Sequence, residues 1–293
     1  MATTPPAEVE ISTALVRRLL EEQHPDLASQ VIEPFASGWD NSLFRLGSDL
    51  LVRLPRRMVS SGLVVKEQRW LPGIAVRVRV TVPVPVRVGL PTAYYPWPWS
   101  ISRWITGDLV ADLPRSARSV FAEPLAAFLR ALGTEAPAGA PANPYRGVRL
   151  GERDAAMQER FRSGLIPHPD AAMRLWQRAL AQPVWDRDPI WVHGDLHPAN
   201  LLTVNGGLHA VIDFGDLTAG DPATDLAAAW LIFDHAGRGR FRAAVDARPE
   251  IDDATWLRAQ GWALNMASAV LVSSDDSPLH RRIGEETIAE LLT

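Results

Sequence analysis

The sequence predicts an α+β fold of two lobes, in which a small antiparallel sheet comes first and a larger helical part follows. Short apolar stretches separated by turn-like residues fill the region 30–103, and apolar residues recur at helical spacing after it. A chain of 293 residues is also long for one lobe. We therefore expect an N-terminal lobe over 1–103 and a C-terminal lobe over 104–293, with a cleft between them.

The first lobe is expected to hold a leading helix over 8–22, five strands and one further helix. The segment QVIEPFASGWDNSLFRLGSDLLVRLPRR contains three apolar stretches separated by turns, which indicates a three-stranded meander. SSGLVVKEQRWLPGI predicts a helix that ends at Pro72 and Gly73. The alternation over 76–88 predicts a strand, but its two prolines cannot donate ladder hydrogen bonds, so only part of it should pair, at a sheet edge. WSISRWI predicts the last strand.

The second lobe is predicted to be mainly helical. Helical patterns occur in SARSVFAEPLAAFLRALGTE, GERDAAMQERFRSGL, DAAMRLWQRALAQ, TDLAAAWLIFDHA and ATWLRAQGWALNMASAVLV. APAGAPANP is typical of a linker or loop, and the region 191–216 of short strands and loops. Just before this lobe, YYPWPW favours a packed turn over a platform on which bases could stack.

Composition excludes several classes of function. Cysteine is absent from the 293 residues, which rules out disulfides and thiol chemistry and fits a reducing cytoplasm. No stretch reaches roughly 18 consecutive apolar residues and the N-terminus has no signal-peptide pattern, so we expect no membrane partner and no secretion. The formal net charge of −4 gives no reason to expect a nucleic acid partner.

Charge differs between the two expected lobes. Residues 1–103 contain 12 Lys and Arg and 9 Asp and Glu, whereas residues 104–293 contain 18 and 25. The resulting charges of +3 and −7 favour an anionic ligand such as a nucleotide on the first lobe and a cationic ligand on the second. An ordinary solvated surface explains the same numbers.

Polar residues at separations that could form a catalytic site lie in WVHGDLHPANLLTVNGGLHAVIDFGD, residues 191–216. Asp195 and Asn200 stand five residues apart, and Asp213 follows a predicted β-hairpin. Phosphoryl transfer from a nucleotide needs a carboxylate that orients the acceptor hydroxyl and takes its proton, together with hard oxygen ligands for Mg²⁺. The spacing matches the kinase pattern H-R-D-L-x-x-x-N followed by D-F-G. The amide oxygen of Asn200 and the carboxylate of Asp213 are therefore the expected Mg²⁺ ligands.

Gly194 precedes Asp195 where protein kinases have Arg, and His197 follows. With these features the chain resembles the aminoglycoside phosphotransferase and choline-kinase-like branch of the protein-kinase-like superfamily over roughly residues 30–275. The specific pieces are VHGDLHPANLL, VIDFGD and GDPATDLA, and the weaker ones are FASGWDNSLFRLG, LLVRLP, KEQRWLPGI and SISRWITGD. The resemblance implies a two-lobed protein-kinase-like fold, with Asp195 as the catalytic base.

The resemblance also implies roles for residues around this motif. Lys66 is the only lysine of the chain, so Arg53 stands where the family carries a strand lysine. The loop over the phosphates would consist of Ser37, Gly38, Trp39 and Asn41. Arg53 would contact the phosphates and pair with Glu67. The hinge whose backbone contacts the nucleotide base would consist of Arg103, Trp104 and Ile105. The catalytic loop would be supported by His193, His197, Asp221 and Asp225. Asp216 would face the acceptor.

These features predict a small-molecule kinase that transfers the γ-phosphoryl of ATP or GTP, with Mg²⁺, to a hydroxyl of an antibiotic, above all an aminoglycoside-like one, or of a related metabolite. The few residues between Asp213 and GDPATD leave no room for the activation segment of a protein kinase. Two alternatives stay open. The glycine-poor phosphate loop and Arg53 suit a nucleotide-binding or regulatory protein with weak or no catalysis, and His193, Asp195 and His197 suit a metal hydrolase.

Overall fold

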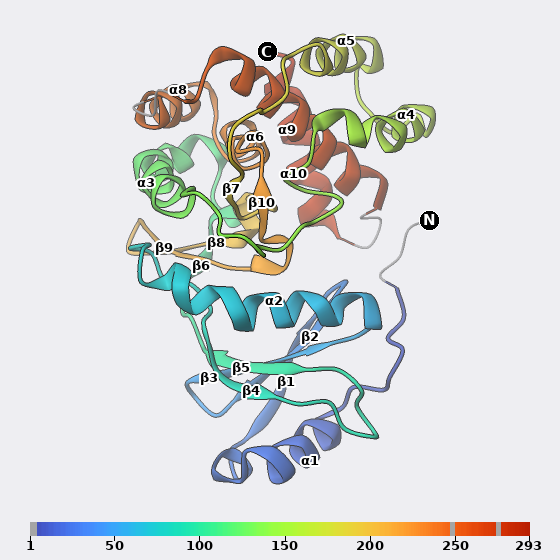
Figure 1. The fold of residues 1–293 in the computed structure, drawn as a ribbon, viewed down its shortest axis with the longest axis vertical. Coiled ribbons are helices and arrows are strands. Elements are labelled where there is room, and N and C mark those ends of the chain that lie inside the picture. The colour runs from blue at the N-terminus through green and yellow to red at the C-terminus, as the bar shows by residue number, and fades with distance from the viewer. Residues whose placement is uncertain (1–4, 247–249, 274–276) are drawn as a thin grey trace. The chain divides into compact units, whose positions relative to one another are not determined.

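The computed structural model describes residues 5–246, 250–273 and 277–293, and Figure 1 shows their helices and strands. The chain divides into two compact units. The first ends at Thr106 and leaves out Val78–Val80, and the second continues from Gly107. Within the described ranges, no helix is long and apolar enough to cross a membrane.

A five-stranded antiparallel sheet is the centre of the first unit, in the order β1-β2-β3-β5-β4. Its strands are β1 (Ile32–Ser37), β2 (Asn41–Leu46), β3 (Leu50–Pro55), β4 (Pro85–Gly89) and β5 (Trp99–Arg103). The predicted meander is confirmed, because β1 pairs with β2 and β2 with β3. Gly47 turns the chain between β2 and β3 with a φ of 57°, a conformation that glycine adopts without steric cost.

One face of this sheet carries the core of the first unit. Side chains two residues apart on β2, β3 and β5 point to this face, where they pack against α1 (Thr13–Gln23). The core consists of Val16, Leu19, Leu20, Phe44, Leu46, Val52, Leu54, Tyr95, Trp97, Trp99 and Ile101. Because Tyr95, Trp97 and Trp99 are buried in it, the YYPWPW segment is the packed turn that we favoured.

The opposite face of the sheet carries α2 (Met58–Ala75), and Figure 1 shows α1 and α2 on either side of the strands. Val52 and Leu54 point toward α1, so Arg53 between them points toward α2. There it meets Glu67, which lies in the middle of that helix. The alternation of β3 therefore separates an apolar face from a charged one.

Two element boundaries differ from the sequence prediction, and a third prediction is confirmed. α2 does not end at Pro72 and Gly73 but continues to Ala75; the lost backbone hydrogen bond of a proline is tolerated here because buried residues flank it. α1 begins at Thr13 rather than at residue 8, because Ser12 caps it by accepting from the Leu15 amide. Of the alternating stretch only β4 forms a strand, at the sheet edge as predicted.

Helices make up most of the second unit. They are α3 (Ala122–Leu132), α4 (Asp154–Arg162), α5 (Pro169–Leu180), α6 (Ala223–Leu226), α7 (Ala228–Leu231), α8 (His235–Val245), α9 (Asp253–Ser273) and α10 (Pro278–Leu291). The single helix predicted over TDLAAAWLIFDHA is wrong, because α6 and α7 are separate and Asp234 caps a new helix, α8. The predicted helix over ATWLRAQGWALNMASAVLV is confirmed as α9, which packs against α5 and α10.

Two small sheets lie among these helices and position the polar segment. β7 (Ile190–Val192) pairs with β10 (Thr218–Gly220), and β8 (Leu201–Val204) pairs with β6 (Asp108–Leu109) and β9 (Gly207–Val211). The loop after β7 holds Asp195, and the turn after β9 holds Asp213. The fold is therefore an α+β arrangement of a five-stranded antiparallel sheet and a helical part, as predicted.

The close packing of Gly89 against Trp99 gives a test of the first core. A Cβ at Gly89 would lie 1.8 Å from the Trp99 ring, whereas a Cβ at Gly62 in α2 would meet nothing within 4 Å. We expect Gly89→Ala to lower the free energy of unfolding by about 1–3 kcal/mol and Gly62→Ala to raise it by up to about 1 kcal/mol. Denaturant unfolding of both variants measures this, and an unchanged Gly89→Ala would contradict the packing.

Candidate active site

The candidate site starts at the end of β7, where His193, Gly194 and Asp195 leave the strand. Asp225, in α6, fixes this departure by accepting from the His193 amide at 2.7 Å and from the Gly194 amide at 2.9 Å. Both amides have left the β7 ladder, so without a partner each would cost desolvation energy. The Asp225 carboxylate therefore fixes the backbone that carries Asp195.

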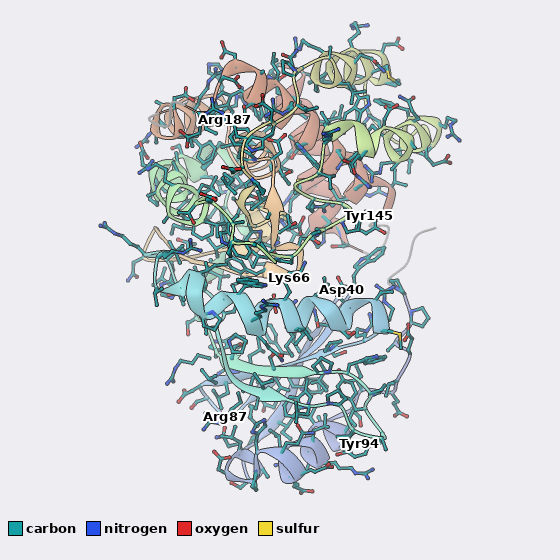
Figure 2. All side chains as sticks on the ribbon, in the orientation of Figure 1. Asp40, Lys66, Arg87, Tyr94, Tyr145 and Arg187 are labelled. Carbon is teal, nitrogen blue, oxygen red and sulfur yellow. The ribbon has the colours of Figure 1, made fainter. Side chains whose placement is uncertain are left out.

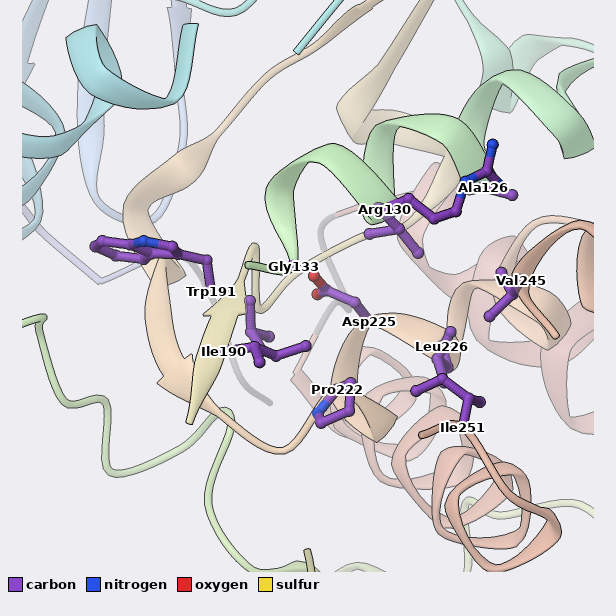
Figure 3. Close-up of a pocket in the computed structure, with 12 residues that line it drawn as sticks. Ala126, Arg130, Gly133, Ile190, Trp191, Pro222, Asp225, Leu226, Val245 and Ile251 are labelled. Atoms are coloured by element: carbon purple, nitrogen blue, oxygen red, sulfur yellow. The ribbon is translucent and has the colours of Figure 1, made fainter. Parts of the chain in front are cut away.

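Asp225 is buried among mainly apolar residues. Figure 3 shows it beside Ile190 of β7 and Leu226 of α6, in a pocket that Trp191 also lines. This burial raises the pKa of Asp225 above its ordinary value, and the two amides and His193 act in the opposite direction. The carboxylate is thus committed to the backbone amides of the loop.

Gly194 is required by the backbone of this loop. Its φ is 91°, which disfavours any residue with a side chain. A Cβ at this position would also lie 2.5 Å from the Asp216 carbonyl oxygen. The glycine that replaces the kinase Arg therefore lets the loop pass close to the segment after Asp213.

His193 joins the loop to that same segment. Its Nδ1 accepts from the Asp195 amide at 3.2 Å, so the proton of the neutral ring belongs on Nε2, which lies 3.1 Å from the Ile212 carbonyl oxygen. Its ring also packs on Phe214, with the ring centroids 4.5 Å apart. His193 is fully buried and links the Asp195 amide to Ile212 and Phe214, the residues on either side of Asp213.

Asp195 is a half-buried carboxylate among positive and polar groups. Burial by itself would raise its pKa, but His197, with Nε2 at 3.4 Å, and Arg146, with Nη2 at 3.3 Å, lower the pKa well below its usual range. The side chain therefore stays ionised at neutral pH. An ionised carboxylate with 28% of its side chain exposed is able to accept a proton from a bound hydroxyl.

Asn200 faces the same loop and adjoins Asp213. Its Nδ2 donates to the Asp195 carbonyl oxygen at 2.9 Å, which turns the amide oxygen away from the loop. Its backbone carbonyl accepts from the Ile212 amide at 3.0 Å, so the residue before Asp213 is bonded to it directly. Asp213 is exposed and has a left-handed backbone with φ 60°, a conformation that is often found at functional sites.

These two residues fit a hard divalent cation. Asn200 offers an amide oxygen and Asp213 a carboxylate, the oxygen ligands that Mg²⁺ prefers. Among the described residues, no group of three His, Asp or Glu side chains is placed to hold a metal ion.

Sequence reasoning missed Asn143 and Arg146, which lie beside Asp216. Asn143 Nδ2 donates to Asp216 at 2.8 Å, and Arg146 Nε lies 3.5 Å from the other Asp216 oxygen. Asn143 lies in the segment APAGAPANP that we took as a linker, and Arg146 lies two residues after it. The Pro141 carbonyl accepts from β10, and the Gly147 carbonyl accepts from the Asp221 amide just after β10. Burial raises the pKa of Asp216, Arg146 opposes this, and the neighbouring Asp195 adds to it.

Asp221 anchors the chain after β10. It accepts from Arg258 of α9 at 2.8 and 3.2 Å and from the Ala223 amide at 3.0 Å. Arg258 and Asp221 are both buried, so each needs the other as counter-charge. The pair fixes the start of α6, which carries Asp225.

The predicted nucleotide-binding residues lie in the first unit. The turn between β1 and β2 is closed by the Gly38 amide, which donates to the Asn41 carbonyl at 3.0 Å, and by Arg56, which donates to the Gly38 carbonyl at 2.5 Å. Ser37 and Ser42 contact through their hydroxyls at 3.3 Å, and Trp39 is 41% exposed at the tip.

Arg53 and Glu67 form the predicted ion pair. Arg53 Nη1 donates to both carboxylate oxygens, at 2.7 and 2.9 Å, and Glu67 is almost fully buried. With the Asn41 amide turned so that its oxygen faces Arg53, that oxygen accepts from Nη2 at 2.9 Å and Nε at 3.0 Å. The arginine thus links α2 to the base of the predicted phosphate loop.

The predicted hinge residues follow β5. Trp104 donates its amide to the Asp49 carbonyl at 2.7 Å, and its ring lies between Phe35 of β1 and the guanidinium of Arg45 on β2. Arg103 is exposed, and Ile105 is half-buried. Their contact with a nucleotide base stays a prediction.

The sequence profile of the phosphotransferase enzyme family, APH, matches residues 31–262. The chain belongs to this family. None of the curated proteins matches the chain in sequence. The resemblance to aminoglycoside phosphotransferases is confirmed by this match and by the solved structures that share the fold.

Solved phosphotransferases share the fold across almost the whole chain. The GDP complex of aminoglycoside 2'-phosphotransferase-IIIa is 21% identical with a TM-score of 0.73, and 96% of this chain and 99% of that chain are covered. A GDP and kanamycin complex of a type IIIa enzyme is 23% identical with a TM-score of 0.72, covering 95% and 98%. The macrolide 2'-phosphotransferase from Brachybacterium faecium is 18% identical with a TM-score of 0.61, covering 94% and 97%.

The phosphotransferase loop gives a sharp test at Gly194. Gly206 also has a positive φ, 76°, but a Cβ there would meet nothing within 4 Å. Gly206→Ala should therefore cost only the left-handed strain, about 1–2 kcal/mol. Gly194→Ala should cost more, because it adds the collision with the Asp216 carbonyl. Thermal unfolding of both variants compares them, and equal losses would mean that the loop has room for a side chain.

Proposed function

We propose that this phosphotransferase is a small-molecule kinase that transfers the γ-phosphoryl group of ATP or GTP to a hydroxyl group of an antibiotic or related metabolite. The observation that carries the proposal is the joint placement of Asp195, Asn200 and Asp213 by one hydrogen-bonded loop. An ionised carboxylate and two oxygen ligands in that arrangement suit phosphoryl transfer. A cytoplasmic setting, which supplies ATP and Mg²⁺, goes with this proposal.

In the proposed reaction Asp195 orients the acceptor hydroxyl and accepts its proton. A bond forms between the acceptor oxygen and the γ-phosphorus, and the bond from that phosphorus to the bridging oxygen of the nucleotide breaks, so that the diphosphate leaves. His197 and Arg146 keep Asp195 ionised and in place for this step. Catalysis then depends mainly on the position of the reactants and the charges around them.

Asn200 and Asp213 would hold Mg²⁺ through their side-chain oxygens. When bound, the ion neutralises charge on the nucleotide phosphates. In the first unit, Ser37, Gly38, Trp39 and Asn41 would cover those phosphates, and Arg53 would contact them from its pair with Glu67. Arg103, Trp104 and Ile105 would meet the base.

Aminoglycosides are the first acceptor class to test, because they occur in the names of several solved neighbours and because residues 104–293 carry a charge of −7. Asp216 would face the acceptor, next to Asp195. Macrolides are the second class, since a macrolide enzyme shares the fold. The rival is a nucleotide-binding protein with weak or no catalysis, which would bind Mg·ATP but turn over no acceptor.

Asp195→Asn tests the proposed base. It keeps the shape of the side chain but removes the proton acceptor, so we expect turnover to fall about 10²–10⁴-fold while the affinity for Mg·ATP stays nearly the same. The control is Asp186→Asn, which removes a charge from an exposed loop. Coupled ADP-release assays over an acceptor panel measure turnover, and unchanged turnover in Asp195→Asn would remove it as the base.

Asp213→Ala tests the proposed metal site. The variant loses one of two protein ligands, so the affinity for Mg·ATP should fall roughly tenfold or more, which corresponds to about 1.4 kcal/mol. Titration calorimetry with Mg·ATP and with metal-free ATP separates metal binding from nucleotide binding. The unsubstituted protein and Asp213→Ala should bind metal-free ATP with equal affinity. Equal affinity for Mg·ATP as well would show that Asp213 is not a Mg²⁺ ligand.

A further inference from the structure

Three arginines of the second unit lie near enough to act on one another's charge, and one of them, Arg146, is beside Asp195. Arg146 belongs to the segment bonded to β10, Arg153 ends the short helix η4 (Leu150–Arg153), and Arg160 lies in α4. Arg153 and Arg160 are seven residues apart, which is two turns, so they share one helix face. We call these three residues the arginine row.

Arg146 is the member of the row that touches the candidate site. Its Nη2 lies 3.3 Å from Asp195 and its Nε 3.5 Å from Asp216, and 18% of its side chain is exposed. Both contacts are longer than a good charge-assisted hydrogen bond, which is 2.7–2.9 Å as a rule. A positive charge therefore stands directly beside the proposed base.

Arg153 and Arg160 have only neutral partners among the described residues. Arg160 Nη1 donates to the Asn265 carbonyl and side-chain oxygens, both at 2.8 Å. Arg153 has a 3.5 Å contact to the Pro144 carbonyl, and its guanidinium lies 5.1 Å from the Tyr145 ring centroid. The Nε of Arg153 is buried without a hydrogen-bond acceptor.

Two acids of the same segment, Asp154 and Glu159, have other partners. Asp154 accepts from Trp176 Nε1 at 2.7 Å and from Gln158 at 3.1 Å, and Glu159 pairs with the exposed Arg162 at 2.5 Å. Within the part of the chain that the structure describes, neither Arg153 nor Arg160 has a carboxylate at salt-bridge distance, and the charge of the neighbouring Glu152 offsets that of Arg153 only in part. Half-buried arginines that lack one cost energy unless a ligand supplies the negative charge.

The arginines also repel one another. Burial lowers the pKa of Arg160 to about 10, and the charges of Arg153 and Arg146 add to this. Burial and Arg146 lower the pKa of Arg153 in the same way. Three partly buried positive charges near one another, one of them beside Asp195, lower the stability of the folded state. A site that binds an anion is one reason for a fold to keep them.

We infer that the arginine row binds an anionic group, a carboxylate or a phosphate, of the hydroxyl compound that this enzyme phosphorylates. The planar forks of Arg153 and Arg160 suit either group. Tyr145, 57% exposed on the loop ahead of η4 and visible in Figure 2, offers a ring face beside Arg153 for the body of the same molecule. The inference rests on the proposed function and narrows its acceptor.

This local charge differs from the average charge of the region. The value of −7 for residues 104–293 favours a polycation, but Arg146 beside Asp195 and its neighbours Arg153 and Arg160 are cationic. A polycationic aminoglycoside placed there would meet like charge, which costs affinity. The acceptor class with a hydroxyl and an anionic group is therefore favoured over aminoglycosides at this position.

Binding of matched hexoses to the full chain tests the inference. The protein is first saturated with Mg²⁺ and a non-hydrolysable ATP analogue, so that the nucleotide site is filled. The probes are then D-glucuronate, D-glucose 6-phosphate, D-glucose and D-glucosamine, which present a carboxylate, a phosphate, no charge and a positive charge on similar hydroxyl scaffolds. Calorimetry should give at least about tenfold tighter binding for one or both anions than for glucose, with glucosamine weakest.

Substitutions in η4 and α4 test whether Arg153 causes the preference for anionic probes. Arg153→Gln should remove most of the anion preference, and Arg153→Lys, which keeps the charge but not the fork, should retain part of it. Arg162→Gln is the matched control, because it removes the same charge from an exposed position on α4. The affinities for glucuronate and glucose 6-phosphate show whether the arginine row prefers a carboxylate or a phosphate.

The outcomes separate this inference from the proposed function. Equal affinity for all four probes would overturn the inference. So would an equal loss of anion affinity in Arg153→Gln and Arg162→Gln. Weaker nucleotide binding in Arg153→Gln, with unchanged affinity for the probes, would also overturn it. Mg·ATP-dependent phosphorylation of neutral or cationic compounds alone would overturn it and leave the kinase proposal intact. Failure to bind the nucleotide analogue in the first step would count against the kinase proposal itself.

Discussion

The carboxylate of Asp225 holds the loop on which the candidate site is built. It accepts the His193 and Gly194 amides, and the positive φ of Gly194 then directs Asp195 back toward the segment that contains Asp213. His193 closes the arrangement from the other side, through the Asp195 amide and the Ile212 carbonyl. Because these groups are buried and mutually bonded, the loop has one stable geometry rather than several.

The surroundings shift the pKa values of the neighbouring carboxylates Asp195 and Asp216 in opposite directions. His197 and Arg146 keep the Asp195 carboxylate ionised, which a proton acceptor requires at neutral pH. Asp216 next to it has the opposite tendency, since burial raises its pKa, and Arg146 is shared between the two. Two neighbouring carboxylates with environments that push their pKa values apart are typical of catalytic sites. In the proposed reaction, the arginine row adds to this positive field.

The fold class and the core of the site could be predicted from the sequence because their signals are local. The alternation of β2 and β3 and the spacing of Asp195, Asn200 and Asp213 are contained in short segments, so no tertiary information is needed. Arg146 could not be predicted, because it follows a proline- and alanine-rich stretch without a motif of its own, and this segment is brought to Asp195 by hydrogen bonds to β10 and Asp221. The continuation of α2 through Pro72 likewise depends on tertiary packing.

A crystal structure of the chain with Mg²⁺ and a non-hydrolysable ATP analogue tests the central claim most directly. The account predicts that Mg²⁺ is bound by the Asn200 side-chain oxygen and the Asp213 carboxylate, together with phosphate oxygens. It also predicts that the Asp195 carboxylate faces the γ-phosphorus from the side opposite the leaving diphosphate, with room for one hydroxyl between them. A metal bound by other residues, or a γ-phosphate remote from Asp195, would contradict it.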